Sequence, residues 1–220
     1  MGSNNNNNNK QEYAYNIIKD SIIKEEYAPN EMISTRSLCE KLGISRTPIT
    51  EAFKRLSYEG FVEMVPNRGV IVSSVSARDL VEIYQLREGI EGVAARMCAQ
   101  NQPMETIGQM RQCLDEGAEA FRNGQYGKAI SMDNKFHTLL IAGSGNERMM
   151  QVMASILHQS GRGNFLQATA TERMKLSAVQ HRSILKAIMD RDPDQAEMHA
   201  REHMRGVQVF VLAYQNAHER

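Results

Sequence analysis

Five side chains in the C-terminal two thirds of the chain have the types and spacing of metal ligands. Asp133 and His137 are four residues apart, and His199 and His203 repeat that spacing near the C-terminus. Residues four apart on a helix lie on one face about a turn from each other, so each pair suits two ligands of one ion. His181 lies between the pairs in a segment whose apolar residues recur at a helical period.

Three histidines and one carboxylate from three helices would leave an ion open to water or to a small anion. Such ligands suit a divalent transition metal, namely zinc, nickel, manganese or cobalt. An isolated histidine is more often a surface or core residue than a ligand. Spacing alone therefore favours Asp133 with His137 and leaves their partners open.

A metal-dependent hydrolase is the catalytic alternative that these ligands raise. No general base of the His-Glu-x-x-His kind and no nucleophile motif accompanies them in the sequence. We therefore expect a protein that is not an enzyme.

A second group of residues, in the first third of the chain, has the chemistry of a helix that reads DNA. Ser45 is a good N-cap, and Pro48 falls in the first helical turn, where its missing N–H is harmless. Arg46, Thr47 and Thr50 are expected to point away from the apolar face, toward base edges. Arg46 can contact guanine through two hydrogen bonds.

Other residues near this helix could contact the DNA backbone. Arg36, Arg55 and Arg68 could neutralise phosphates, and Gly69 would let a hairpin approach the duplex closely. Any one of these arginines could equally be an ordinary surface charge. Lys10–Val75 holds nine basic and nine acidic residues, so the DNA interpretation depends on the order of the residues and not on bulk charge.

The elements that would position these residues are predicted by period and by turn residues. Helices are expected over residues 10–26, 34–42 and 45–60, and strands over 61–65 and 70–73. Gly43 joins the second and third helices, and Pro66-Asn67-Arg68-Gly69 makes the turn of a hairpin. Two helices with a tight glycine turn, followed by a hairpin, are typical of a winged helix-turn-helix.

The remainder of the chain is predicted to be helical after an N-cap at Ser76. The expected helices cover residues 77–100, 103–122, 126–141, 147–168, 171–189 and 192–216. The fold class is therefore mainly α, with a winged helix-turn-helix DNA-binding domain over 10–75 and an all-helical bundle over 76–220. Residues 1–9, which contain six consecutive asparagines, are expected to be a disordered tag or tail.

Two features that the sequence lacks indicate the cellular compartment of the protein. Three separated cysteines form no disulfide framework and no Cys-x-x-Cys pair, which suits a reducing cytoplasm. No apolar run approaches the length needed to span a bilayer. We expect a cytoplasmic protein that does not enter a membrane.

The N-terminal segment resembles the DNA-binding domain of GntR-type regulators. The resemblance lies in Ser34 through Pro48, Arg55-Leu56, Glu59-Gly60 and Asn67-Arg68-Gly69. It implies that Arg36, Arg46, Arg55 and Gly69 contact an operator. Where the family usually has an arginine this chain has Thr50, which puts the usual operator sequence in doubt.

The C-terminal segment resembles the all-helical FCD effector domain of FadR-type regulators. The similar stretches are Tyr84–Arg96, Asp133–His137, Gly145-Asn146, His181–Ile188 and Glu202–Met204. The resemblance assigns the metal to Asp133, His137, His181 and His203, and leaves His199 pointing outward. It also places Gln180 where the family usually has a glutamate.

Small organic or sugar acids are the effectors that this resemblance implies. Arg87 would face the same cavity and pair with a carboxylate, with Arg162 as a second anion-facing residue. A helix-surface pair between Arg87 and Glu91 is an equal alternative. The whole chain is thus expected to be a homodimeric transcription regulator whose operator affinity responds to the acid. The remaining alternative is constitutive DNA binding with a purely structural metal.

Overall fold

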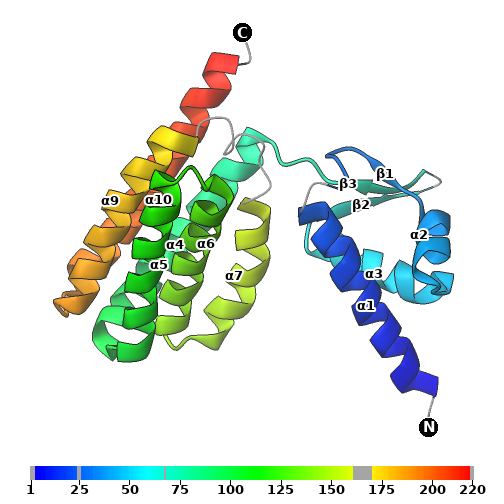
Figure 1. Cartoon of the computed structure of the whole chain (residues 1–220), viewed down its shortest axis with the longest axis horizontal. Coiled ribbons are helices and arrows are strands. Elements are labelled where there is room, and N and C mark those ends of the chain that lie inside the picture. The colour runs from blue at the N-terminus through cyan, green and yellow to red at the C-terminus, as the bar shows by residue number, and fades with distance from the viewer. Residues whose placement is uncertain (1–2, 24–25, 67, 161–169, 219–220) are drawn as a thin grey trace. The chain divides into compact units, whose positions relative to one another are not determined.

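The chain folds into two compact units, Met1–Val75 and Ser76–Arg220 (Figure 1). The computed structural model describes residues 3–23, 26–66, 68–160 and 170–218. In the described part, no helix is long and apolar enough to cross a membrane.

The helices of the first unit are set by local capping. They are α1 (Ser3–Ile23), α2 (Thr35–Leu42) and α3 (Arg46–Tyr58). The Ser34 side chain accepts a hydrogen bond from the Ser37 N–H, which caps α2, and Gly43 ends that helix with a φ of 65°. Ser45 holds the N-cap position of α3, but its side chain makes no capping hydrogen bond.

Helix α1 begins at Ser3, so the structure differs from the disorder expected over residues 1–9. Asparagine has a modest helix propensity and gives no helical signal in the sequence. The second half of α1 is anchored by burial of Ala14, Tyr15 and Ile18. Extension of an anchored helix adds about one hydrogen bond per residue, which explains how the asparagine run can continue it.

The small sheet of the first unit has the strand order β1-β3-β2, and all its pairs are antiparallel. Strands β2 (Val62–Val65) and β3 (Gly69–Val72) form the expected hairpin, with Val65 opposite Gly69. Strand β1 (Met32–Ile33) was not expected, because two residues are too few to show an alternating pattern.

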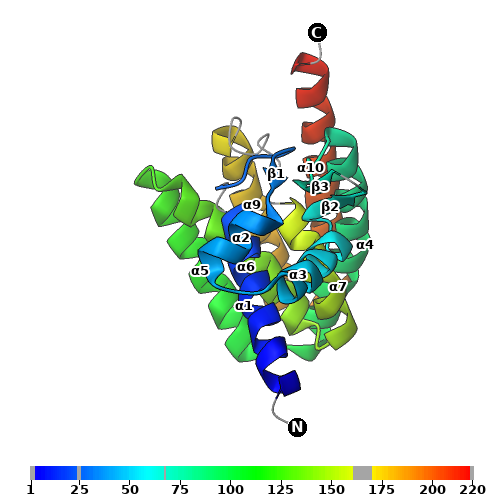
Figure 2. The same ribbon diagram turned by 90° about the vertical axis from the view of Figure 1, so that its right-hand side faces the viewer.

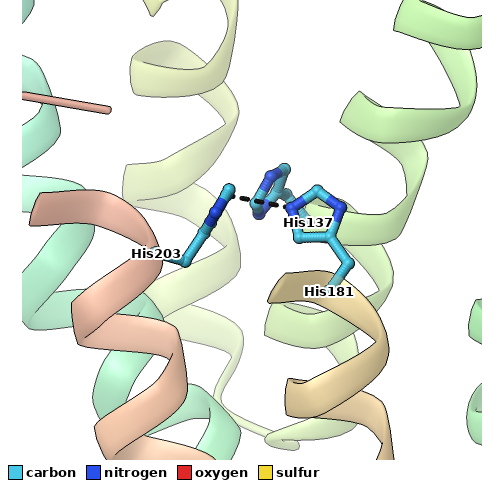
Figure 3. A group of neighbouring side chains, drawn as sticks. All are labelled: His137, His181 and His203. Atoms are coloured by element: carbon cyan, nitrogen blue, oxygen red, sulfur yellow. Dashed lines mark hydrogen bonds between the residues drawn. The ribbon is translucent and has the colours of Figure 1, made fainter. Parts of the chain in front are cut away.

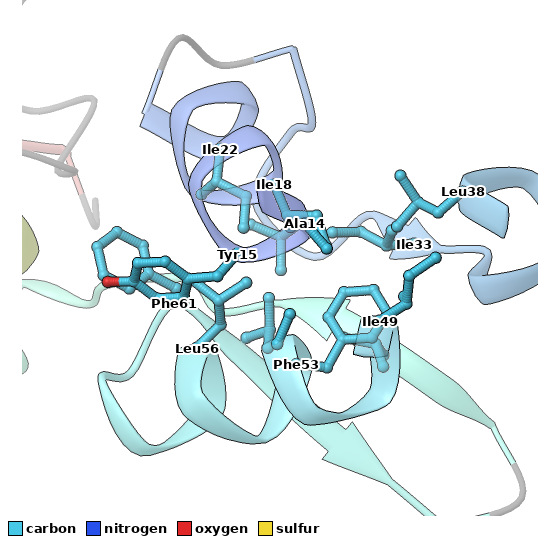
Figure 4. Packing of buried hydrophobic residues seen from close by; sticks show 14 of the residues in the cluster. Ala14, Tyr15, Ile18, Ile22, Ile33, Leu38, Ile49, Phe53, Leu56 and Phe61 are labelled. Carbon is cyan, nitrogen blue, oxygen red and sulfur yellow. The ribbon is translucent and has the colours of Figure 1, made fainter. Parts of the chain in front are cut away.

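One apolar core joins the elements of the first unit (Figure 4). Ala14 and Ile18 of α1 lie toward Ile49, Phe53 and Leu56 of α3. These side chains are essentially inaccessible to solvent. The inward face of α3 is therefore fixed by packing, and the opposite face of that helix is left to the solvent.

The second unit is entirely helical in its described residues. Its helices are α4 (Ala77–Asn101), α5 (Met104–Arg122), α6 (Tyr126–Gly143), α7 (Glu147–Ser160), α9 (Ala170–Met189) and α10 (Pro193–His218). Each expected helix is present within two or three residues at its described ends. The continuation expected from 161 to 168 lies outside the described residues.

Helix α4 is the element that holds the second unit together. It packs against α6, α7, α9 and α10, and both views show α10 running alongside it (Figures 1 and 2). Its start is fixed by a capping box, in which Ser76 and Asp79 exchange hydrogen bonds through side chain and backbone. The core around it includes Phe136, Leu140 and Ile184.

Candidate functional site

Three histidines from three helices converge inside the second unit (Figure 3). His137 comes from α6, His181 from α9 and His203 from α10, and all three are buried. One ring nitrogen of each lies within 4.8 Å of the others. The helical fold thus brings together residues that are up to 66 positions apart in the sequence.

Asp133 lies one turn before His137 at the edge of this cluster. One of its carboxylate oxygens is 3.8 Å from His137 Nε2, and the other is 3.5 Å from His181 Nδ1. Its side chain is 39% exposed, so it faces both the histidines and an opening. His199 instead lies near Glu202, with 3.6 Å between Nδ1 and the carboxylate, and takes no part in the cluster.

Glu91 on α4 orients His137. Its carboxylate lies 2.6 Å from His137 Nδ1 and accepts 2.7 Å from Arg87 Nε. Burial alone would raise the pKa of Glu91, but Arg87 and His137 beside it lower the pKa to about 2. An ionised carboxylate can only accept, so His137 Nδ1 donates to it, and Nε2 is the ring nitrogen left for the cluster.

Gln180 plays the corresponding part for His203. The Gln180 side-chain oxygen lies 2.9 Å from His203 Nδ1, which places His203 Nε2 2.9 Å from His181 Nε2. A donating Nδ1 leaves Nε2 of His203 as the available ligand atom. The two outer hydrogen bonds, which His137 donates to Glu91 and His203 donates to Gln180, therefore turn two imidazoles inward.

The cluster is chemically suited to bind a cation as neutral imidazoles. Burial lowers the pKa of His181 to about 3, and burial together with the neighbouring histidines holds the pKa of His203 well below its ordinary value. Two nitrogens about 2.1 Å from one ion are about 3.0 Å apart when they bind at right angles. The 2.9 Å separation of the His181 and His203 Nε2 atoms is compatible with such a pair.

A cavity of about 140 Å³ adjoins the histidines. Its walls include Tyr84, Asp133 and His137, together with two buried guanidinium groups from Arg87 and Arg173. Cavities that hold drug-sized ligands are roughly two to seven times larger, so this one fits a small molecule.

Arg87 pairs with Glu91 and also lies on the wall of the cavity. It pairs with Glu91 as an i, i+4 neighbour, but the pair is buried and not on the surface. Its Nη1 donates 3.2 Å to Ser160 Oγ, and its Nη2 has no hydrogen-bond partner in the described part of the chain. A donor without a partner therefore remains on a wall of the cavity. Arg162, the other expected anion-facing residue, lies outside the described residues.

The exposed N-terminal end of α3 carries the residues expected to read bases. Arg46 and Thr47 are exposed, while Pro48 and Ile49 are buried in the core behind them. Thr50 is half-buried, and its hydroxyl donates 2.9 Å to the Arg46 carbonyl. Thr50 can still accept a hydrogen bond, but its donor is occupied by the helix.

The residues expected to contact phosphates differ in how strongly other side chains of the protein hold them. The Arg36 side chain is 90% exposed and pairs only loosely with Glu40 on the same helix. Arg55 instead bonds Glu12 and Glu59 and covers the Tyr15 ring at 3.7 Å, which ties α3 to α1. Arg68 is exposed next to Gly69, whose φ of 109° favours glycine.

The sequence did not predict the contacts that three residues of the second unit make around the histidines and the cavity. Glu91 orients a histidine, Gln180 orients another, and Arg173 lines the cavity. The i, i+4 spacing of Arg87 and Glu91 is a usable signal for the first. No local pattern marks the other two, because their partners depend on how α9 and α10 pack.

Comparisons with known proteins match both units. The profile of bacterial regulatory proteins of the gntR family matches residues 10–72, and that of the FCD domain matches residues 82–206. The Nta operon transcriptional regulator of Aminobacter aminovorans is 30% identical over 196 residues, covering 89% of this chain and 86% of its own. An uncharacterized HTH-type transcriptional regulator of Bacillus subtilis, YdhC, is 26% identical over 190 residues, covering 86% and 85%.

Solved structures share the fold. A putative GntR transcriptional regulator from Rhodococcus sp. RHA1 has a TM-score of 0.77 at 19% identity and covers 93% of this chain and 98% of its own. McbR/YncC of E. coli has a TM-score of 0.77 at 20% identity and covers 94% and 98%.

A winged helix-turn-helix followed by an all-helical unit defines a class of DNA-binding transcription regulators, not enzymes. The chain belongs to the GntR family of bacterial regulatory proteins and carries an FCD effector-binding domain.

Proposed function

We propose that the protein is a homodimeric repressor or activator whose operator affinity changes when a small organic acid binds beside a metal ion in the second unit. The observation that carries this proposal is the cluster of His137, His181 and His203 next to a cavity lined by Arg87. A metal alone would need no such cavity.

The residues that would hold the metal are Asp133, His137, His181 and His203. Support comes from burial that lowers the pKa of His181 and of His203, and from the hydrogen bonds that His137 and His203 donate to Glu91 and Gln180, which turn the other ring nitrogen of each inward. The ion would supply a positive charge and an open coordination position for an acid. Zinc, nickel, manganese and cobalt all fit this ligand set.

The acid would lie in the cavity against Arg87. The free Nη2 of that side chain supplies a donor, and Glu91 fixes the guanidinium in place. Arginine binds carboxylates through paired hydrogen bonds. Arg162 remains a proposed second contact for the same ligand.

The first unit would bind the operator through α3 and the hairpin. Arg46, Thr47 and Thr50 are the proposed base contacts, and Arg36, Arg55, Arg68 and Gly69 are the proposed backbone contacts. Arg46 is the best supported of the proposed base contacts, because it is exposed at the first position of α3. Two copies would place two α3 helices on a palindromic site.

Metal binding is tested on the full chain freed of any affinity tag. Elemental analysis after purification without chelator should give about one ion per chain. His137→Ala combined with His181→Ala should abolish it, whereas His199→Ala should not. Full metal content in the double variant would contradict the assignment.

Operator binding is tested by gel shift with promoter fragments at moderate salt. Arg46→Ala should lower specific affinity by about 10- to 100-fold, because a bidentate contact to guanine is worth about 1–3 kcal/mol. Arg78→Ala, an exposed arginine paired with Glu82 in the other unit, is the control. If no organic acid shifts the melting temperature in a screen with and without chelator, the metal is purely structural and DNA binding is constitutive.

A further inference from the structure

Arg173 is a buried cation that forms no salt bridge with any residue that the structure describes. It lies on α9, only 7% exposed, on the wall of the cavity that adjoins the histidines. Its hydrogen bonds to the Gln180 side-chain oxygen and to the His203 carbonyl are both 3.4 Å long, and both acceptors are uncharged. Its Nε has no partner among the residues that the structure describes.

Such an arrangement is unfavourable in the free protein. A buried charge is normally paired, because removing an unpaired charge from water costs several kcal/mol. Arg87, on the same cavity, has the pairing that Arg173 lacks, since Glu91 bonds it directly. Burial accordingly lowers the pKa of Arg173, whereas Glu91 outweighs burial and raises the pKa of Arg87.

Gln180 explains why Arg173 has no salt bridge within the described part of the chain. Its side-chain oxygen lies 3.4 Å from Arg173 Nη1 and 2.9 Å from His203 Nδ1, and it is an amide oxygen. A carboxylate at this position would neutralise Arg173 from within the protein. With glutamine there, the positive charge is left for whatever enters the cavity.

The balance of charges around the cavity also indicates a site for a negatively charged ligand. Its two guanidiniums are matched in number by the carboxylates of Glu91 and Asp133. A divalent ion on the histidines would then add two positive charges that no described side chain offsets. A ligand with two negative charges would balance them.

We infer that the natural ligand is a small diacid, with one acidic group at the metal and Arg87 and the second held by Arg173. This inference rests on the proposed function, because it takes the metal and Arg87 as the first anchor. The cavity of about 140 Å³ restricts the ligand to a short chain. Arg173 is thus the residue that selects diacids over monoacids.

The test uses the full chain loaded with nickel and two acids of equal carbon number, succinate and butyrate. Isothermal titration should show that succinate binds at least about tenfold more tightly than butyrate. In Arg173→Gln the succinate affinity should fall to that of butyrate, whose own affinity should stay unchanged. Arg182→Gln, an exposed arginine on the same helix paired with Asp115, is the matched control.

Gln180→Glu provides a second test that keeps Arg173 in place. The new carboxylate would pair with Arg173, so in nickel-loaded protein the ratio of the succinate affinity to the butyrate affinity should fall toward one. In the metal-free, ligand-free protein, Arg173→Gln should raise the melting temperature, because it removes an unpaired buried charge. A merely structural arginine would lower it.

The outcomes separate the two proposals. Equal affinities for succinate and butyrate in the unaltered chain would overturn the diacid inference and leave the acid-binding function standing. An equal loss of both affinities in Arg173→Gln would also overturn it. If neither acid binds the nickel-loaded chain, the proposed acid response itself fails, and the diacid inference fails with it.

Discussion

Glu91 bonds the Arg87 guanidinium and the His137 ring in the interior of the second unit, and its negative charge stabilises both contacts. It is 1% exposed and bonds Arg87 Nε and His137 Nδ1. Neutralising it leaves the Arg87 guanidinium buried without a counter-ion, which costs about 3–5 kcal/mol for a broken buried pair.

Glu91→Gln should therefore lower the unfolding free energy by about 3 kcal/mol or more. It should also weaken metal binding by about 10- to 100-fold, because His137 loses its charged partner. Urea unfolding and metal titration measure the two effects. Glu82→Gln, an exposed glutamate on the same helix, should change neither. A variant as stable as the original chain would show that Arg87 finds another counter-ion.

The buried histidines make the metal-free protein sensitive to mild acid. The folded-state pKa of His181 is lowered to about 3 and that of His203 is lowered too, so unfolding takes up protons below pH 6.5. Their contribution to stability is complete above pH 6.5 and is lost as the pH falls from 6.5 toward 3. The stability that depends on Glu91 is lost only below its unfolded-state value of 4.5.

In the presence of chelator, the unfolding free energy should fall between pH 6.5 and 5. The slope should approach about 1.4 kcal/mol per pH unit for each of the two histidines. His181→Asn should reduce that slope, and His199→Asn, a histidine outside the cluster, should retain it. A flat profile in urea unfolding would mean that these side chains already bind protons in the folded chain.

The residues proposed as metal ligands could be predicted from the sequence more readily than the side chains around them. Asp133 and His137 share a helix, so their spacing is visible in the sequence, and the resemblance supplied His181 and His203. Glu91 and Gln180 bond histidines that lie on other helices. Arg173 is notable because its Nε has no hydrogen-bond partner among the described residues. Such relations depend on packing between distant segments and leave no local periodicity.

At the scale of the helices, α4 and α10 pack closely because a glycine lies between them. A Cβ added at Gly92 would lie 2.7 Å from Arg201 Cγ, near the base of that side chain. Arg201 is also held by Glu197 at 2.7 Å. Gly89, one turn earlier on α4, has no atom within 4 Å of such a Cβ.

Gly92→Ala should therefore destabilise the second unit by about 1–3 kcal/mol through overpacking. Gly89→Ala should stabilise it by up to about 1 kcal/mol, because alanine has the higher helix propensity. Thermal unfolding of the two variants measures the difference. The opposite order would mean that Arg201 moves aside without cost.

The elements themselves were largely predictable from the sequence. Helix ends at Gly43 and Ser76 coincide with their turn and cap residues, and the hairpin follows its Pro-Asn-Arg-Gly turn. Strand β1 was missed because it is defined only by pairing with β3. Helix α1 was predicted too short at its N-terminus because asparagine carries no helical signal.

At the scale of the whole molecule, the metal residues all belong to one of the two compact units. Asp133, His137, His181 and His203, with the supporting Glu91, lie within Ser76–Arg220. A ligand that binds only the folded state stabilises the unit that it binds. The first unit has its own core and contributes no residue to the cluster.

Metal addition should therefore raise the melting transition of the second unit and leave that of the first unchanged. Calorimetry of the full chain with and without chelator measures both transitions. Phe53→Ala, a substitution in the core of the first unit, should lower only the melting temperature of the first unit. A single transition that moves as a whole in both experiments would show that the two units unfold together.

Helix α4 connects the proposed acid site with the N-terminal end of the second unit. Arg87 lies ten residues into a helix that starts directly after Ser76, a distance of about 15 Å at 1.5 Å per residue. A tilt of about 5° around Arg87 would move the first residue of α4 by about 1.3 Å. The capping box at Ser76 resists fraying, so α4 would transmit that tilt as a stiff rod and not dissipate it as local unwinding.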